Sequence, residues 1–199
     1  NSINMKKLIV ITLFSFIYLI SSAPPNVSND LSPLNVFQAY KTYQVKLERK
    51  RLMDSAAYHE SRNCPTIVNS IGCLGLFQFG KSARKITGYG HVDIKHAIRD
   101  QKTGKRYLNI AYWPVKDQYL AMDSLMNFNQ TKLAKEIDIY VGSRVCGVEI
   151  TLSGIIMTAH LAGWHGVKNW FDTFGKDNAT DMNGTSILTY MKLFSGYKI

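Results

Sequence analysis

Hydrophobic residues recur at helical spacing along most of the chain. From residue 34 to Glu60 the apolar positions fall three or four residues apart, which predicts helical structure that continues to Glu60. The clearest apolar face consists of Leu52, Met53, Ala56 and Ala57. Ser32 and Pro33 stand directly before this stretch, where a serine N-cap and a first-turn proline favour the start of a helix.

Further helices are expected where the same spacing returns, at residues 81–87, 114–128, 132–140, 152–161, 167–174 and 186–194. The segment 152–161 is apolar on every side, which is typical of a central helix buried all round. Gly163 and Gly166 follow it and are expected to frame a tight connection. Residues 62–72 are rich in turn formers and are expected to form a loop or hairpin. The predicted fold class is therefore mainly α, and α+β at most.

The N-terminus has the three regions of a secretory signal. A pair of lysines precedes the apolar run 8–20, and Ser21, Ser22 and Ala23 follow it. The run is shorter than the roughly 20 residues of a membrane-spanning helix. We therefore expect residues 1–23 to be a signal peptide or N-terminal hydrophobic segment, 24–33 a linker and 34–199 one folded domain. The protein would then be exported to the periplasm or the cell exterior, with transient membrane association through 8–20 as an alternative.

The net charge of +10 attracts the protein toward polyanions such as nucleic acid, anionic lipid or a bacterial wall. No zinc-finger, RNP or P-loop motif occurs, so nucleic acid is not an expected partner. The three cysteines form no C-x-x-C pair, and the histidines lack the spacing of a zinc motif. No metal and no cofactor are therefore expected, while a disulfide between Cys64 and Cys73 remains open.

The strongest candidate for chemistry is Glu60, which ends an apolar helix and is followed by a glycine-punctuated loop. Such a position can half-bury a carboxyl group, and burial raises the pKa of a carboxylic acid because it disfavours the charged form. A proton held near neutral pH is what glycoside cleavage requires, since the leaving oxygen must be protonated.

Three motifs resemble those of soluble lytic transglycosylases and goose-type lysozymes. Glu60-Ser61 and then Gly75-Leu76-Phe77-Gln78 are similar to the Glu-Ser and Gly-Leu-Met-Gln motifs of these enzymes. The segment 159–166 resembles their Ala-Tyr-Asn-Ala-Gly-x-Gly motif, and Tyr190 matches a tyrosine that commonly follows. The resemblance extends to phage-associated muramidases and covers about residues 45–195.

The resemblance implies a lysozyme-like fold and cleavage of the MurNAc-GlcNAc β-1,4-glycosidic bond of peptidoglycan. In that family Glu60 would be the general acid and then the base, and Ser61 would orient it or the N-acetyl group. Gln78 would bind the glycan or the catalytic carboxylate, and Tyr190 would polarise the acid. Gly72 and Gly75 would let the backbone approach the sugar.

Two departures fall in the third motif, where His160 and Leu161 stand in place of tyrosine and asparagine. His160 is kept as a candidate substrate-binding residue, and the contact normally made by asparagine is in doubt at Leu161.

Lytic transglycosylases use one carboxylate, whereas an inverting hydrolase needs a second. Acids are sparse after Glu60 until Asp93 and Asp100, which slightly favours a transglycosylase, with Asp93 as the candidate second carboxylate.

Two other functions remain open. The altered third motif would also suit a non-catalytic wall-binding protein that retains the fold. The apolar run 8–20 would suit a membrane-anchored or virion structural protein, with virion or wall-complex partners.

Overall fold

The computed structural model describes residues 32–181 and 184–199. Residues Thr42–Ile199 form one compact unit, and the described residues 32–41 belong to a separate one. The boundary falls inside a helix, eight residues after the domain start expected at residue 34. The predicted signal segment 1–23 and nearly all of the predicted linker lie outside the described residues.

Helices dominate the described chain, which confirms the predicted mainly α fold class. The elements in chain order are α2 (Pro33–Ser61), α3 (Lys81–Ile86), the 3₁₀ turn η1 (Ile94–His96), β1 (Ala97–Arg99), β2 (Arg106–Leu108), α4 (Val115–Lys132), α5 (Ala134–Tyr140), β3 (Arg144–Val145), β4 (Val148–Glu149), α6 (Leu152–Asp172) and α7 (Ile187–Leu193). The described strands form two separate antiparallel pairs, β1–β2 and β3–β4. None of the described helices combines the length and apolarity that crossing a membrane requires.

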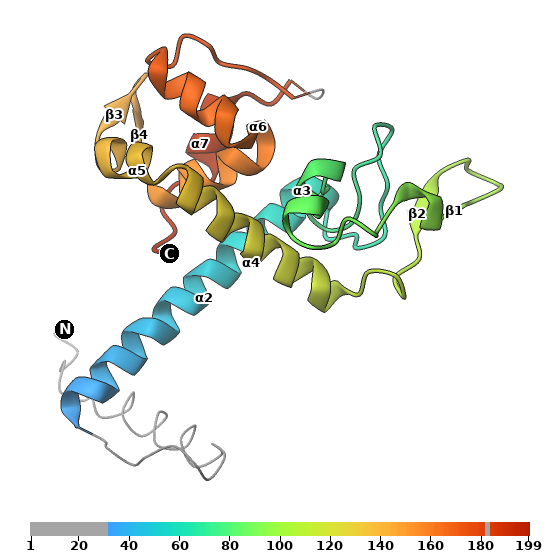
Figure 1. Ribbon diagram of the computed structural model, residues 1–199, viewed down its shortest axis with the longest axis horizontal. Coiled ribbons are helices and arrows are strands. Elements are labelled where there is room, and N and C mark those ends of the chain that lie inside the picture. The colour runs from blue at the N-terminus through green and yellow to red at the C-terminus, as the bar shows by residue number, and fades with distance from the viewer. Residues whose placement is uncertain (1–31, 182–183) are drawn as a thin grey trace, which may run out of the picture. The chain divides into compact units, whose positions relative to one another are not determined.

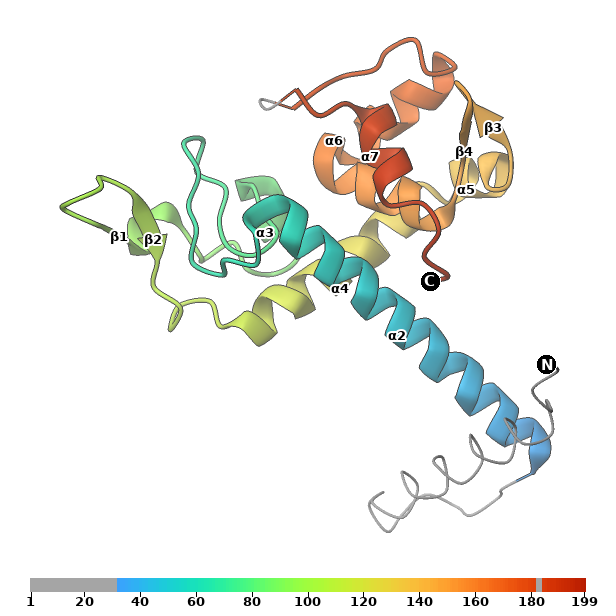
Figure 2. The same cartoon turned by 180° about the vertical axis from the view of Figure 1, so that it is seen from behind.

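Helix α6 is the centre of the larger unit. Seven consecutive residues, 153–159, are buried, which confirms the central buried helix expected from the uniform hydrophobicity of this stretch. The helix contributes to two hydrophobic clusters, with Ile156 and Met157 in the first and Ile155 and Ala159 in the second. Helix α7 lies alongside α6 in both views (Figures 1 and 2).

The predicted connection after this helix is a sharp kink. Gly163 has φ 71° and ψ 160°, a backbone conformation that glycine adopts without steric cost and that interrupts the helical path. Helical structure resumes directly after Gly163. The second half of α6 therefore begins earlier than the start at Val167 that the sequence predicted. A tight glycine connection is therefore present, but it is shorter than the spacing of Gly163 and Gly166 suggested.

The first hydrophobic cluster joins α2 to α4 and to the loop between residues 74 and 79. From α2 it contains Leu52, Met53, Ala56 and Ala57, which are the residues of the predicted apolar face. The helix continues unbroken to Ser61, as the pattern indicated, and Ser32 accepts a hydrogen bond from the backbone of Asn35 at its start.

A buried amide fixes the loop that follows α2. Gln118 of α4 has no exposed surface, and its Nε2 donates to the carbonyl oxygens of Pro65 and Trp113 at 3.0 and 2.8 Å. Its Oε1 accepts from the Leu76 amide at 2.6 Å. A β-carbon on Gly75 would collide with this side chain, so close packing against Gln118 and a φ of +76° both require glycine there.

The sequence pattern missed both small sheets. Strands of two or three residues are too short to show an alternating pattern. Helix α4 also runs to Lys132 and past the expected end at 128. Asn129, which falls between the two helices expected at 114–128 and 132–140, is instead buried within this helix.

We expect Gln118→Leu to lower the free energy of unfolding by about 2–4 kcal/mol, because it leaves buried backbone groups without partners. Urea unfolding followed by circular dichroism measures this change. Gln130→Leu, at an exposed position of the same helix, is the matched control and should change stability by less than about 0.5 kcal/mol. Equal stabilities for the two variants would contradict the structural role of the Gln118 amide.

Candidate active site

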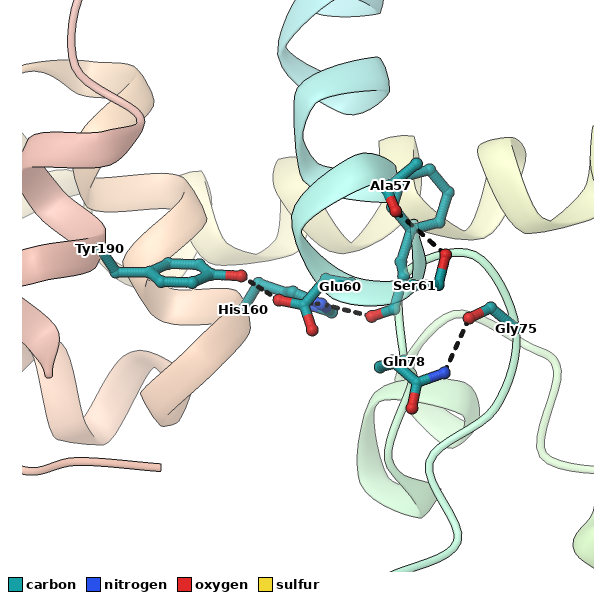
Figure 3. A network of polar contacts seen from close by, with 8 residues as sticks. Ala57, Glu60, Ser61, Gly75, Gln78, His160 and Tyr190 are labelled. Carbon is teal, nitrogen blue, oxygen red and sulfur yellow. Dashed lines mark hydrogen bonds and ion pairs between the residues drawn. The ribbon is translucent and has the colours of Figure 1, made fainter. Parts of the chain in front are cut away.

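Glu60 lies in the last turn of α2, where the preceding turns bury their apolar face and leave it at the edge of the core. Its side chain is 18% exposed. The Tyr190 hydroxyl donates a hydrogen bond to Oε1 of Glu60, as Figure 3 shows. No hydrogen bond from the described residues reaches the second oxygen, Oε2. The carboxyl group is therefore held on one side and free to bind on the other.

Tyr190 reaches Glu60 from α7, 130 residues further along the chain. The residue is 4% exposed, and its ring packs edge-on against Phe194. Burial, and then the nearby negative charge of Glu60, raise the pKa of Tyr190 far above its ordinary value. The phenol therefore keeps its proton and acts as a permanent hydrogen-bond donor to the carboxylate.

His160 stands behind the carboxyl group at the end of the buried part of α6. Its Nε2 lies 2.7 Å from the Phe77 carbonyl oxygen and 4.0 Å from Oε1 of Glu60. The short distance to a carbonyl, which only accepts, assigns the proton to Nε2. Its Nδ1 is buried and has no hydrogen-bond partner among the described residues. The ring therefore connects α6 to the loop that carries Gln78.

A cleft of about 370 Å³ opens in front of Glu60. It is lined by Glu60, Ile67, Asn69, Ser70, Ile71, Cys73, Gln78, His160, Leu161 and Asp181. Three of the predicted site residues, Glu60, Gln78 and His160, thus share one cleft, and Tyr190 contacts it through Glu60. The predicted residues Ser61 and Gly75 are not part of its lining.

Gln78 lies across the cleft from Glu60 and makes no hydrogen bond to it (Figure 3). Its Nε2 donates to the Gly75 carbonyl oxygen at 2.9 Å, and its backbone has the unusual φ of 48°. Gly75 therefore acts beneath the cleft surface, where it accepts from Gln78 and leaves room for Gln118. Gln78 presents its amide carbonyl as the group available to a ligand.

Ser61 is buried and points away from the cleft. Its hydroxyl donates to the Ala57 carbonyl oxygen at 3.0 Å and accepts from the Cys64 amide at 3.1 Å. These bonds close the C-terminus of α2 and start the loop that follows. Ser61 therefore positions Glu60 through the backbone and does not itself face the cleft.

The second carboxylate at the cleft is Asp181, which the sequence did not single out. Asp93 lies elsewhere, where its side chain accepts from the Lys95 amide at 3.1 Å and caps η1. That hydrogen bond holds the pKa of Asp93 below its ordinary value. Asp181 accepts from the Thr185 amide at 2.7 Å, and the Gly184 amide donates to its carbonyl oxygen. Aspartate three residues before glycine predicts a turn, but not the direction of the carboxylate.

The three cysteines carry free thiols. Cys73 lines the cleft, and burial raises the pKa of its thiol above the ordinary value, so it remains protonated and unreactive near neutral pH. Within residues 32–181 and 184–199, no three histidine, cysteine or acidic side chains gather closely enough to hold a metal ion.

Comparisons with models of protein families, with curated proteins and with solved structures find no match for this chain.

We expect the stability of the protein to fall as the pH rises above about 10. Burial and the 2.8 Å hydrogen bond to Asp54 raise the pKa of Tyr119 to about 12, and the pKa of Tyr190 is also raised. The folded state therefore retains phenolic protons that the unfolded state loses, and stability present below about pH 10 is lost above it. Urea unfolding at about pH 9 and about pH 11 measures the loss.

Tyr119→Phe should reduce the difference between the two pH values, because the phenylalanine has no proton to lose. The exposed Tyr43 provides the matched control, and Tyr43→Phe should leave the difference unchanged. An unchanged pH dependence in Tyr119→Phe would show that this phenol does not ionise late.

Proposed function

We propose that this protein cleaves the MurNAc-GlcNAc β-1,4-glycosidic bond of peptidoglycan, with Glu60 as general acid and base. The observation that supports this most strongly is the hydrogen bond from Tyr190 to Glu60 inside a cleft that also contains Gln78 and His160. The sequence motifs led to these four residues independently of their positions in space. The proposal includes a lysozyme-like fold and requires an exported protein, for which residues 1–23 supply the expected signal.

The proton transfer follows from the two oxygens of Glu60. Oε2 would carry the proton and deliver it to the glycosidic oxygen as the bond from that oxygen to C1 breaks. The carboxylate formed in this step accepts a hydrogen bond from Tyr190, which remains protonated. A donor that is already in place stabilises the charge as it develops and needs no reorganisation, so it lowers the barrier.

The surrounding side chains would hold the sugar strand. The carbonyl oxygen of Gln78 can accept from a sugar hydroxyl or an N-acetyl amide across the cleft. Leu161 provides apolar surface at the position of the asparagine in the resembled motif, so no side-chain amide contact arises there. The Asn69 backbone and Ser70 would extend the contact along one side of the cleft.

In the one-carboxylate mechanism the 6-hydroxyl of the muramic acid attacks C1 and returns its proton to Glu60. The product has an anhydro end and no water is consumed. This lytic transglycosylase chemistry needs no acid other than Glu60.

Hydrolysis is the second candidate, and the presence of Asp181 in the cleft lining favours it. A water molecule would attack C1 and give a proton to Asp181, while Glu60 protonates the leaving oxygen. The product then has a reducing end. The two mechanisms therefore differ in whether Asp181 takes part.

We expect Glu60→Gln to reduce the release of muropeptides from purified walls by about 100-fold or more, because glutamine cannot donate the required proton. Glu149→Gln removes an exposed carboxylate far along the chain and serves as the matched control, with activity near that of the parent protein. Full activity in Glu60→Gln would refute the proposal. Walls that bind the parent protein but are never cleaved by it would instead indicate a wall-binding protein.

Asp181→Asn separates the two mechanisms. If water is activated by Asp181, its replacement should lower the release of reducing ends by about 100-fold. If the one-carboxylate mechanism holds, mass spectrometry should find anhydro ends, and the rate in Asp181→Asn should stay within about threefold of the parent. If Asp181→Asn forms reducing ends at an unchanged rate, neither water activation by Asp181 nor the one-carboxylate mechanism is correct.

A further inference from the structure

A second hollow, of about 350 Å³, lies next to the cleft and carries a strong positive charge. It is lined by Val68, Asn69, Ser70, Arg99, Gly104, Lys105 and Arg106. Asn69 and Ser70 belong to the lining of both hollows and form the wall between them. A strand that occupies the cleft would therefore pass directly beside the cationic side chains of the β1–β2 hairpin.

The hairpin brings two arginines into direct opposition. Arg99 of β1 and Arg106 of β2 are paired across the antiparallel ladder, and both are exposed. Like charges placed opposite each other weaken a strand pair. Lys105 adds a third positive charge beside them. None of the three forms an ion pair with a described acidic residue, so all three cationic groups are available to an anionic ligand.

The acidic residue nearest to the two arginines in the sequence is Asp100, and its side chain forms hydrogen bonds within the hairpin turn. Asp100 accepts hydrogen bonds from the backbone amides of Lys102 and Thr103, each at 2.9 Å. These bonds hold the pKa of Asp100 below its ordinary value. Its carboxylate therefore stabilises the turn and forms no ion pair with the arginines.

The hairpin is also fixed relative to the cleft. The Leu108 amide donates to the Thr66 carbonyl oxygen at 2.6 Å, and Ile67 pairs with Tyr107 in an isolated bridge. The shared wall is rigid as well, because Oδ1 of Asn69 accepts from the amides at positions 71 and 73. Both views show the hairpin beside the loop that precedes α3 (Figures 1 and 2). The cations are thus held at a set position along the path of a strand.

We propose that this hollow is an anion subsite that binds the carboxylates of the peptide stems on the peptidoglycan strand in the cleft. Guanidinium groups suit this ligand because they bind carboxylates in a planar, two-point geometry. A carboxylate between Arg99 and Arg106 also relieves their mutual repulsion. The inference rests on the proposed function, since it names the part of the same substrate that the neighbouring hollow recognises.

The test uses binding, so that it does not depend on turnover. The full chain with Glu60→Gln is sedimented with walls from which phosphate-bearing polymers have been removed. Adding Arg99→Gln and Arg106→Gln should weaken binding by roughly five- to tenfold. The matched control, Lys102→Gln with Lys135→Gln, removes two exposed positive charges outside the hollow and should weaken binding by less than about twofold.

A second arm identifies the ligand. Chemical amidation of the stem carboxylates should abolish the difference between the two double variants, because the anions are then neutral. Equal weakening by both double variants would overturn the subsite, since diffuse net charge would then explain the binding. A difference that appears only on walls retaining phosphate polymers would also overturn it, by assigning the hollow to phosphate.

The same measurements distinguish this inference from the proposed function. If the parent protein fails to cleave walls while the Arg99 and Arg106 variant still binds more weakly than its control, the function fails and the subsite stands. If cleavage depends on Glu60 and the two double variants bind alike, the function stands and the subsite fails. Because the variant removes a repulsive pair, its thermal unfolding should show no loss of stability.

Discussion

The hydrogen bond between Tyr190 and Glu60 is the interaction on which the candidate site depends. It connects the C-terminus of α2 to α7, and α6 supplies His160, whose Nε2 lies 4.0 Å from the same carboxyl oxygen. Each of these helices is held in place by its buried apolar residues. The carboxyl group is therefore placed by hydrophobic packing and then oriented by one phenol that cannot ionise near neutral pH.

The local elements of the fold were largely predictable, because they depend on neighbouring residues. The apolar face at residues 52–57, the cap at Ser32 and the break at Gly163 are all visible in the sequence and present in the structure. The β1–β2 and β3–β4 pairs were not predictable, since strands this short are stabilised by their partners and not by their own pattern. Gln118 was missed because a polar residue on a helix is usually exposed.

The site was predictable in part, because some of its residues belong to short local sequence motifs. Motifs led to Glu60, Gln78, His160 and Tyr190, which lie together, and also to Ser61 and Gly75, which support the site from beneath. Asp181 carries no local signal beyond a turn. Its place in the lining of the same cleft as Glu60 depends on tertiary packing, which sequence spacing does not specify.

The kink at Gly163 requires glycine for its backbone geometry and not for side-chain packing. Open space surrounds the position where a β-carbon would stand, so any side chain could be accommodated there sterically. An L-residue would be strained at φ 71° and ψ 160°, a backbone region that is essentially restricted to glycine, by about 1–3 kcal/mol, whereas the same residue would favour a continuous helix. The absence of a single methyl group at Gly163 thus decides whether α6 is bent or straight. Straightening would redirect residues 164–172, and with them Val167, Trp170 and Phe171, which now pack in the second hydrophobic cluster.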